Sequence, residues 1–233
     1  MRAVIVSHGQ PGDPAPQQQA IEELAAAVMD QNPGCEVVGA TLAMPGALAR
    51  AADDDSLIYP MFMAEGWFTR SELPRRLAQT GTKGARVMRP FGTDAGLPAL
   101  IVAKAHQAAA SCGWRPGETT LLLTAHGSQR SQASFTITTD IAARIAPHFA
   151  DVVTGFVEQA PFIADAARGL TQAVSLPFFA LRAEHVTDDL PAALDQADFT
   201  GPRLDPIGLA PEVPGLIAAA IRNAANKDSR NDL

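Results

Sequence analysis

The chain has 233 residues, of which 47% are hydrophobic and 18% charged, so it can form a sizeable core and is not globally disordered. Its net charge of -7, without a dense run of Lys or Arg, argues against nucleic acid or an anionic membrane surface as the main partner. The two cysteines, Cys35 and Cys112, lie far apart and indicate reduced thiols rather than a disulfide framework or a thiolate metal site. No apolar run is long enough for a signal-peptide core or a membrane-spanning helix, so we expect a cytoplasmic protein without a membrane segment.

The first half of the sequence alternates short apolar runs, typical of buried parallel strands, with amphipathic segments typical of helices. The expected strands cover residues 2–6, 35–40, 56–63 and 85–88, and the expected helices cover residues 17–30, 45–52, 71–79 and 97–110. A cluster of Gly and Pro between residues 111 and 117 then indicates a boundary.

The same order of elements starts again after this boundary. The expected strands cover residues 119–124, 152–157, 174–180 and 203–205, and the expected helices cover residues 131–145, 162–173, 188–196 and 211–226. Residues 227–233 are polar, and we expect them to form a flexible tail.

The two halves are an internal repeat. VSHGQ at residues 6–10 matches TAHGS at 124–128, residues 60–74 match 177–191 without a gap, and residues 90–101 match 206–217. Matches in the same order and at nearly the same spacing predict an α/β chain of two tandem modules, residues 1–112 and 118–226. We expect each module to form a four-stranded parallel sheet flanked by helices, and a pseudo-twofold axis to relate the two.

Comparison of the copies identifies candidate functional residues at the strand ends. His126, Glu158 and His185 follow the first three strands of the second copy. Their expected counterparts in the first copy are His8, Leu42 and Phe68. Because the carboxyl ends of parallel strands meet at one rim of a sheet, the three polar residues are expected to face a common cleft.

Two imidazoles and a carboxylate suit a divalent first-row metal ion, and they also suit general acid–base catalysis. A simpler interpretation is available for single residues: His185 caps the following helix, and Glu158 pairs with Arg168 or Arg182. The joint position of the three residues at equivalent strand ends favours a functional site.

The segments AHGS at residues 125–128 and PFFALRAEHVTDDLP at 177–191 resemble the CbiX-type sirohydrochlorin chelatases, within the class II tetrapyrrole chelatases. The resemblance covers nearly the whole chain and implies two fused copies of the family's module. It implies an enzyme that inserts Co²⁺ or Fe²⁺ into sirohydrochlorin, in cobalamin or sirohaem biosynthesis. It also implies that His126 and His185 bind the incoming metal, that Glu158 assists, and that no cofactor is needed beyond this metal substrate.

The expected partners are therefore a tetrapyrrole and a divalent metal ion, and the tandem fusion favours a monomer. Phe68 stands where the N-terminal copy would need its second histidine, so we expect a degenerate site in residues 1–112 and the working site in residues 118–226.

Binding of the macrocycle requires apolar walls and cations for its carboxylates. Candidate substrate contacts are Gly127, Ser128, Arg130 and Arg182 in the second copy, and Trp67 and Phe68 in the first. Three further arginines of the first copy are weaker candidates, namely Arg70, Arg75 and Arg76. For any single arginine, a solvated surface charge is the simpler interpretation.

The strand order of a doubly wound sheet places the strands before His126 and His185 side by side. Glu158 follows the outer strand, so we expect it to lie farther away, as a group that positions a ligand or transfers protons. Two other functions remain open: a non-catalytic tetrapyrrole- or metal-binding paralogue, and a hydrolase or phosphotransferase that uses His126. The second is disfavoured because no GxSxG, P-loop or HExxH motif accompanies the histidine.

Overall fold

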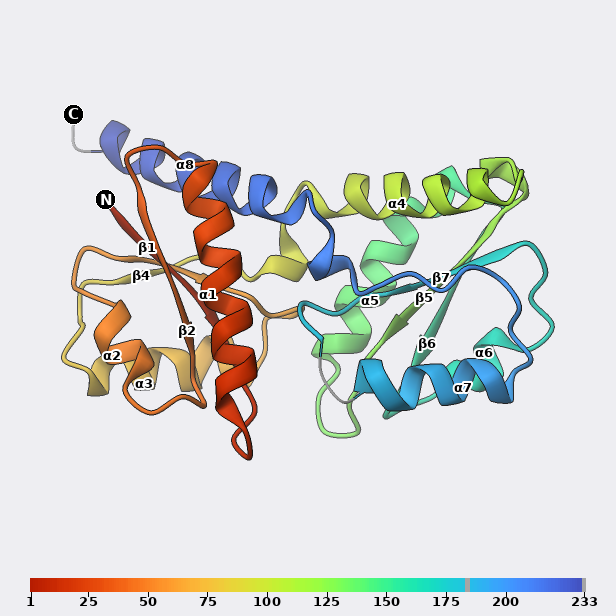
Figure 1. The fold of residues 1–233 in the computed structure, drawn as a ribbon, viewed down its shortest axis with the longest axis horizontal. Coiled ribbons are helices and arrows are strands. Elements are labelled where there is room, and N and C mark those ends of the chain that lie inside the picture. Colours follow the sequence, from red (N-terminus) through yellow and green to blue (C-terminus); the bar gives the residue numbers. More distant parts are fainter. Residues whose placement is uncertain (183–184, 232–233) are drawn as a thin grey trace. The chain divides into compact units, whose positions relative to one another are not determined.

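The structure is a computed structural model that describes residues 1–182 and 185–231, without the side chains of His185 and of residues 227–231. The chain forms two compact units (Figure 1). Unit 1 comprises Met1–Asp94 and Pro211–Leu233, and unit 2 comprises Ala95–Ala210. Within the described residues, none of the helices combines the length and the apolar character needed to cross a membrane.

Unit 1 contains a four-stranded parallel sheet with the order β2-β1-β3-β4. Its strands are β1 (Arg2–Ser7), β2 (Glu36–Thr41), β3 (Leu57–Pro60) and β4 (Arg86–Val87). The central strand β1 is buried along residues 3–7, as its continuous apolar sequence predicts for a parallel strand covered on both faces.

The helices of unit 1 cover this sheet. They are α1 (Pro14–Asp30), α2 (Ala47–Ala51), the π-helix η1 (Phe68–Glu72), α3 (Leu73–Gln79), the short 3₁₀ helix η2 (Phe91–Thr93) and α8 (Val213–Asn231). Val4 and Ile58 of the sheet belong to one buried cluster with Leu48 of α2 and with Leu73 and Leu77 of α3.

Unit 2 contains a three-stranded parallel sheet with the order β6-β5-β7. Its strands are β5 (Thr120–Ala125), β6 (Asp151–Phe156) and β7 (Ala173–Pro177). The helices are α4 (Leu97–Ser111), α5 (Ala133–Ile145), α6 (Ile163–Ala167) and α7 (Leu190–Gln196), with the π-helix η5 (His185–Asp189) before α7 and the 3₁₀ helices η3 (Pro116–Glu118), η4 (Ala146–His148) and η6 (Ile207–Leu209).

The prediction of a fourth strand in the second sheet is wrong. Residues 203–205 make only an isolated parallel bridge, between Arg203 and Ser175. The segment lies between Pro202 and Pro206, which have no backbone N–H to donate, so it is too short to continue a ladder.

The predicted repeat is confirmed by the order of strands and helices in the two units. Both sheets place the first strand of the copy between its second and third strands. The π-helices η1 and η5 begin at Phe68 and His185, which the gapless sequence match also pairs, and each leads into a seven-residue helix. Residues that this match pairs therefore occupy equivalent positions in the two units.

The compact units do not coincide with the predicted modules 1–112 and 118–226. Helix α4 belongs to the first sequence copy but lies in unit 2, where it contacts β7 and α5. Helix α8 belongs to the second copy but lies in unit 1, where Arg222 Nη1 donates a hydrogen bond of 2.8 Å to Gln31 O. Each unit therefore contains the last long helix of the other copy. Helix α8 also continues to Asn231, through much of the segment 227–233 that we expected to be a flexible tail.

Candidate functional site

His126 directly follows β5, at the carboxyl end of the central strand of unit 2. Its Nδ1 atom lies 2.8 Å from Gly127 O. Because a carbonyl oxygen only accepts hydrogen bonds, Nδ1 is the donor in this contact, and in a neutral imidazole this leaves the lone pair on Nε2. This is the tautomer that a metal ion bound through Nε2 requires.

Gly127 is required by the shape of the loop after His126. Its φ is +74°, in the left-handed region. A Cβ atom at this position would lie 2.8 Å from Gln159 Cγ and 2.9 Å from Phe156 Cβ. Gly9, its counterpart after His8, has a φ of +73° and is equally crowded.

Side chains from other elements hold the backbone of this loop. Gly127 N donates to Ser134 Oγ at 3.1 Å, and Ser128 N donates to Gln159 Oε1 at 2.7 Å. Ser128 Oγ in turn accepts a hydrogen bond of 3.1 Å from Arg130 N. The backbone N–H groups of Gly127 and Ser128 are thus already used within unit 2, and Gln159 and Ser134 are positioning residues that the sequence did not identify.

Glu158 follows β6, an outer strand of the sheet, and its carboxylate lies beside His126. Its Oε2 atom is 3.7 Å from His126 Nδ1, and both side chains are partly exposed. The alternative ion pairs for Glu158 are not formed, because Arg168 pairs with Asp165 at 3.1 Å and Arg182 with Asp205 at 2.6 Å.

The predicted pairing of Glu158 with Leu42 is wrong by one residue. Val157 N and Glu158 N bond to Ala125 O and His126 O, and the same pair of bonds is made in unit 1 by the N atoms of Leu42 and Ala43. Val157 is therefore the counterpart of Leu42, and Glu158 is the counterpart of Ala43. The error arose because the loop between this strand end and the next proline has one more residue in the second copy.

His185 begins η5, after β7, and β7 pairs with β5 as we predicted. Its side chain lies outside the described part of the structure, so the predicted pair of His126 and His185 stays a prediction. The equivalent position in unit 1 is occupied by Phe68, whose ring lies 4.5 Å from the ring of His8 in an edge-on contact. Residue 185 thus has the backbone position from which, in unit 1, a side chain reaches the strand-end histidine.

Arg130 and Arg182 differ in their surroundings. Arg182 forms the ion pair with Asp205, although both side chains remain exposed. Arg130 lies in the loop after His126, and its guanidinium has no ion-pair partner among the side chains that the structure describes. Arg130 is the stronger candidate for contact with a substrate carboxylate.

The candidate arginines of unit 1 are paired with glutamates. Arg70 lies 3.0 Å from Glu65, while Arg75 and Arg76 both lie 2.7 Å from Glu72. The hydrogen bonds from Arg75 and then Arg76 lower the pKa of Glu72 to about 2. These pairs stabilise unit 1 and make its arginines weaker candidates for substrate binding.

Phe68 lies within an aromatic cluster of unit 1. The ring of Trp67 is 5.0 Å away, edge-on, and the ring of Phe62 is stacked at 6.0 Å. The Trp67 residue is 63% exposed, so it presents a flat apolar surface to solvent.

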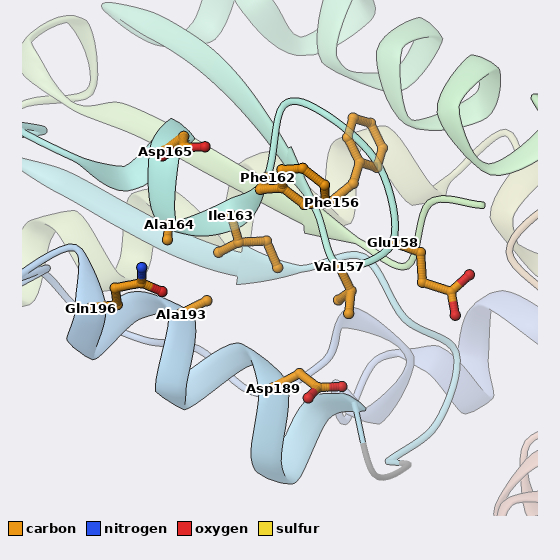
Figure 2. A pocket seen from close by; sticks show the side chains of 10 residues that line it. All are labelled: Phe156, Val157, Glu158, Phe162, Ile163, Ala164, Asp165, Asp189, Ala193 and Gln196. Carbon is orange, nitrogen blue, oxygen red and sulfur yellow. The ribbon is translucent and has the colours of Figure 1, made fainter. Parts of the chain in front are cut away.

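Unit 2 also contains a pocket of about 560 Å³ beside Glu158 (Figure 2). Its walls come from the end of β6, from the start of α6 and from α7. The lining residues are Phe156, Val157, Glu158, Phe162, Ile163, Ala164, Asp165, Asp189, Ala193 and Gln196.

No group of three His, Cys, Asp or Glu side chains among the described residues could hold a metal ion. The side chain of His185 lies outside the described residues, so the pair of His126 and His185 as metal ligands stays a prediction. A preformed site of three or more described ligands is excluded.

The model of the CbiX family matches residues 120–224. A solved structure of CbiX, described as the terminal enzyme for biosynthesis of siroheme in denitrifying bacteria, is 60% identical and covers 96% of this chain and 99% of its own, with a TM-score of 0.92. The protein DR2241 from Deinococcus radiodurans, a multi-domain protein with structural similarity to chelatases and two additional domains, is 25% identical. The match covers 94% of this chain and 54% of DR2241, with a TM-score of 0.70.

SirB from Bacillus subtilis, solved with Fe³⁺, is similar in fold, with a TM-score of 0.73 at 14% identity, and the match covers 98% of this chain and 97% of SirB. Among curated proteins, no sequence gave a significant match.

Proposed function

Because the chain belongs to the CbiX family, we propose that it is a chelatase that inserts a divalent metal ion into sirohydrochlorin. The observation that carries this proposal is the 60% identity, over 96% of the chain, to a CbiX described as the terminal enzyme for biosynthesis of siroheme. That similarity favours Fe²⁺ over Co²⁺ as the inserted ion, and sirohaem as the product. The metal is a substrate, so the reaction needs no further cofactor.

The chemistry of insertion fits the surroundings of His126. The macrocycle must lose two pyrrole N–H protons when M²⁺ enters it. His126 donates from Nδ1 to Gly127 O, so in the neutral ring Nε2 carries the lone pair that can bind the ion. We propose His185 as the second ligand. Two neutral ligands hold an ion weakly enough to release it into the macrocycle, unlike a closed four-ligand structural site.

Glu158 is proposed as the group that removes protons. Its carboxylate lies 3.7 Å from His126 Nδ1 and is 44% exposed, so it can pass protons to solvent. At 3.7 Å the Glu158 carboxylate acts on His126 through charge, while the hydrogen bond from Nδ1 to Gly127 O orients the ring.

The substrate contacts follow from the side chains that are accessible. Arg130 is proposed to bind a carboxylate of the macrocycle, and Arg182 can do the same if it exchanges its partner Asp205. Gly127 and Ser128 are proposed to act by holding the loop, since their N–H groups are already bonded. The exposed ring of Trp67, with Phe68 beside it, is proposed as an apolar contact for the macrocycle in unit 1.

Both copies lie in one chain, so we propose that a monomer is sufficient.

The experiment is a turnover assay that follows the absorbance change of sirohydrochlorin with Fe²⁺ and, separately, with Co²⁺. We expect turnover with at least one of the ions, faster with Fe²⁺, and a loss of about 100-fold in Glu158→Gln, which keeps the shape but cannot accept a proton. The matched control is Glu118→Gln, a carboxylate of unit 2 that pairs with Arg115 just before β5, at the end of this strand opposite to His126. Binding of sirohydrochlorin without turnover with either ion would overturn the proposal and support a non-catalytic paralogue.

A further inference from the structure

His8 is the histidine of the sequence repeat that the proposed chemistry does not use. It directly follows β1 and is exposed, and its Nδ1 atom lies 2.6 Å from Gly9 O. Nδ1 is therefore the donor in this contact, and in the neutral ring this leaves the lone pair on Nε2. None of the groups that the structure describes forms a hydrogen bond or an ion pair with Nε2. His8 thus offers a nitrogen ligand to a metal that approaches from solvent.

A single imidazole suits a metal that already has other ligands. Among the side chains that the structure describes, no group of three His, Cys, Asp or Glu could hold a bare ion, so a bare ion is not expected at His8. A tetrapyrrole supplies the nitrogen ligands of its own plane, and its iron then needs only an axial ligand from the protein, commonly a histidine. The hydrogen bond from Nδ1 to a backbone carbonyl orients such a ligand and raises its basicity.

An aromatic cluster lies beside His8 in unit 1. The Phe68 ring lies 4.5 Å from the imidazole ring at an interplanar angle of 83°, and the Phe62 ring is stacked on Phe68. An iron–nitrogen bond lies in the plane of the imidazole, so a macrocycle ligated through Nε2 is also perpendicular to that plane and can run parallel to Phe68. Trp67, next to Phe68, adds a flat apolar surface that is open to solvent. The cluster therefore provides the apolar contacts that a macrocycle requires.

Basic side chains adjoin Trp67 in the chain. Glu65 pairs with Arg70 at 3.0 Å and with Arg89 at 3.4 Å, so two guanidinium groups share one carboxylate. The trio keeps one net positive charge, and both arginines are exposed. Peripheral carboxylates of a tetrapyrrole can pair with this charge.

The second copy has polar residues at the positions of the two aromatic ones. The gapless match pairs Trp67 with Glu184 and Phe68 with His185. Unit 1 thus retains the strand-end histidine and the left-handed Gly9 after it, but has apolar rings in place of a second candidate ligand. This combination suits a macrocycle whose metal is already in place.

We propose that His8 binds an iron tetrapyrrole as the axial ligand of the iron, with the macrocycle against Phe68 and Trp67. The choice of this ligand rests on the proposed function, because insertion of iron would produce an iron tetrapyrrole. The site binds the metallated macrocycle and takes no part in metal insertion.

The experiment is an absorption titration of the full chain with haemin, an iron tetrapyrrole, without sirohydrochlorin and without a free metal ion. We expect saturable binding and a Soret band typical of imidazole ligation. His8→Ala should lose this band and at least about tenfold in affinity, because the iron–nitrogen bond is lost. Protoporphyrin IX, the same macrocycle without iron, should bind the wild type and His8→Ala equally. Trp67→Ala should weaken the binding of both ligands, because it removes apolar contact rather than coordination.

The matched controls are His148→Ala and Phe162→Ala, an exposed histidine and an exposed aromatic residue of unit 2, and neither should change the titration. Circular dichroism of each variant separates loss of the site from loss of the fold. A wild type without the imidazole-type band, or a His8→Ala variant that keeps it, would overturn the proposal. Loss of the band in His126→Ala but not in His8→Ala would place the iron in unit 2 and would overturn it as well.

Haemin binding and turnover are separate measurements, so the two proposals can fail separately. A chain that inserts iron but does not bind haemin through His8 contradicts this inference alone. A chain that binds haemin through His8 but inserts no metal supports the binding site and contradicts the proposed function. Titration with sirohaem distinguishes the source of the ligand: tighter binding of sirohaem supports retention of the chain's own product, and tighter binding of haemin supports a haem from another source.

Discussion

At the residue scale, the loop after β5 fixes the position of His126. The hydrogen bond to Gly127 O selects the tautomer, Glu158 lies beside the protonated nitrogen, and Gln159 holds the following backbone. His126, Glu158 and Gln159 are at least partly exposed, so the imidazole is held in place without being buried. Such an arrangement suits a ligand that must bind an ion and release it.

Substitution of Gly127 tests this loop. Gly127→Ala places a Cβ atom at a φ of +74° and within 2.9 Å of Phe156 Cβ, so we expect a loss of at least about 1–2 kcal/mol in unfolding free energy. Because the strain is relieved by moving the loop, chelatase activity should fall as well. Urea denaturation and the turnover assay measure the two effects.

Two other glycines serve as controls for Gly127→Ala. Gly9→Ala has the same strain in unit 1 and should lose stability but keep activity. Gly12→Ala has open space around the added methyl group and should change neither property. Equal activity in Gly127→Ala and Gly12→Ala would show that the loop does not position the reacting groups.

The sequence predicted part of this site and missed the rest for physical reasons. That His126 and Glu158 lie together could be predicted, because each follows a parallel strand and strand ends converge, while their roles stay a prediction. The pairing of Glu158 with Leu42 failed because a proline was used as the anchor, whereas one extra residue lies between that proline and the strand. Gln159 gave no signal, since its hydrogen bond to Ser128 depends on how two loops 31 residues apart approach each other.

At the element scale, the π-helices η1 and η5 are the most informative feature of the duplication. The sequence match across residues 60–74 and 177–191 predicted equivalent segments, but hydrophobic periodicity does not distinguish a π-turn from the start of an α-helix. Each π-helix begins at the residue that distinguishes the two copies, Phe68 or His185, and ends at an acidic residue, Glu72 or Asp189. A π-turn is often found at functional sites, and here it brings the variable residue to the rim of the sheet.

The ion pairs of Glu72 make the stability of unit 1 depend on pH. The carboxylate is only 7% exposed and its pKa is lowered from 4.5 to about 2 by Arg75 and Arg76. A lowered folded-state pKa stabilises the fold above the unfolded value of about 4.5, and this stabilisation disappears as the pH falls towards 2.

We therefore expect Glu72→Gln to be less stable than the wild type near pH 7, with a difference that shrinks below pH 4.5 and vanishes near pH 2. Urea midpoints measured across this range give the result directly. A difference that stays constant down to pH 2 would show that the substitution acts through packing rather than through charge.

At the scale of the whole molecule, the exchange of the last long helices between the copies could not be predicted from the repeat. Helices α4 and α8 occupy equivalent places in the two copies, and each has one apolar face. Ile101 and Ile217 are equivalent, and both are completely buried. An apolar face predicts that a helix packs on a sheet. With two similar sheets in one chain, the helix can pack on the sheet of its own copy or on the sheet of the other copy.

Hydrogen exchange distinguishes these two packing arrangements of α4 and α8. Ile217→Ala should cost about 2–5 kcal/mol and reduce amide protection mainly in β1, β2 and β3, because α8 belongs to unit 1. Ile101→Ala should have the corresponding effect in β5, β6 and β7. The opposite pattern would mean that each helix covers the sheet of its own sequence copy.

The duplication also allows the proposed working site to be compared with the proposed degenerate one. His8 and His126 follow equivalent strands, and both place Nδ1 against the carbonyl of the next glycine. The groups around them differ: Ala43 and Phe68 in unit 1 replace Glu158 and His185 in unit 2. The proposed chemistry therefore requires the neighbours of the histidine as well as the histidine itself.

The most direct test compares His126→Ala with His8→Ala in the metal-insertion assay, since the two histidines have the same backbone setting. We expect His126→Ala to reduce turnover of sirohydrochlorin by about 100-fold or more, because both a metal ligand and the partner of Glu158 are lost. His8→Ala should keep most of the wild-type rate. Equal losses in the two variants, or a larger loss in His8→Ala, would contradict the assignment of the active site to unit 2.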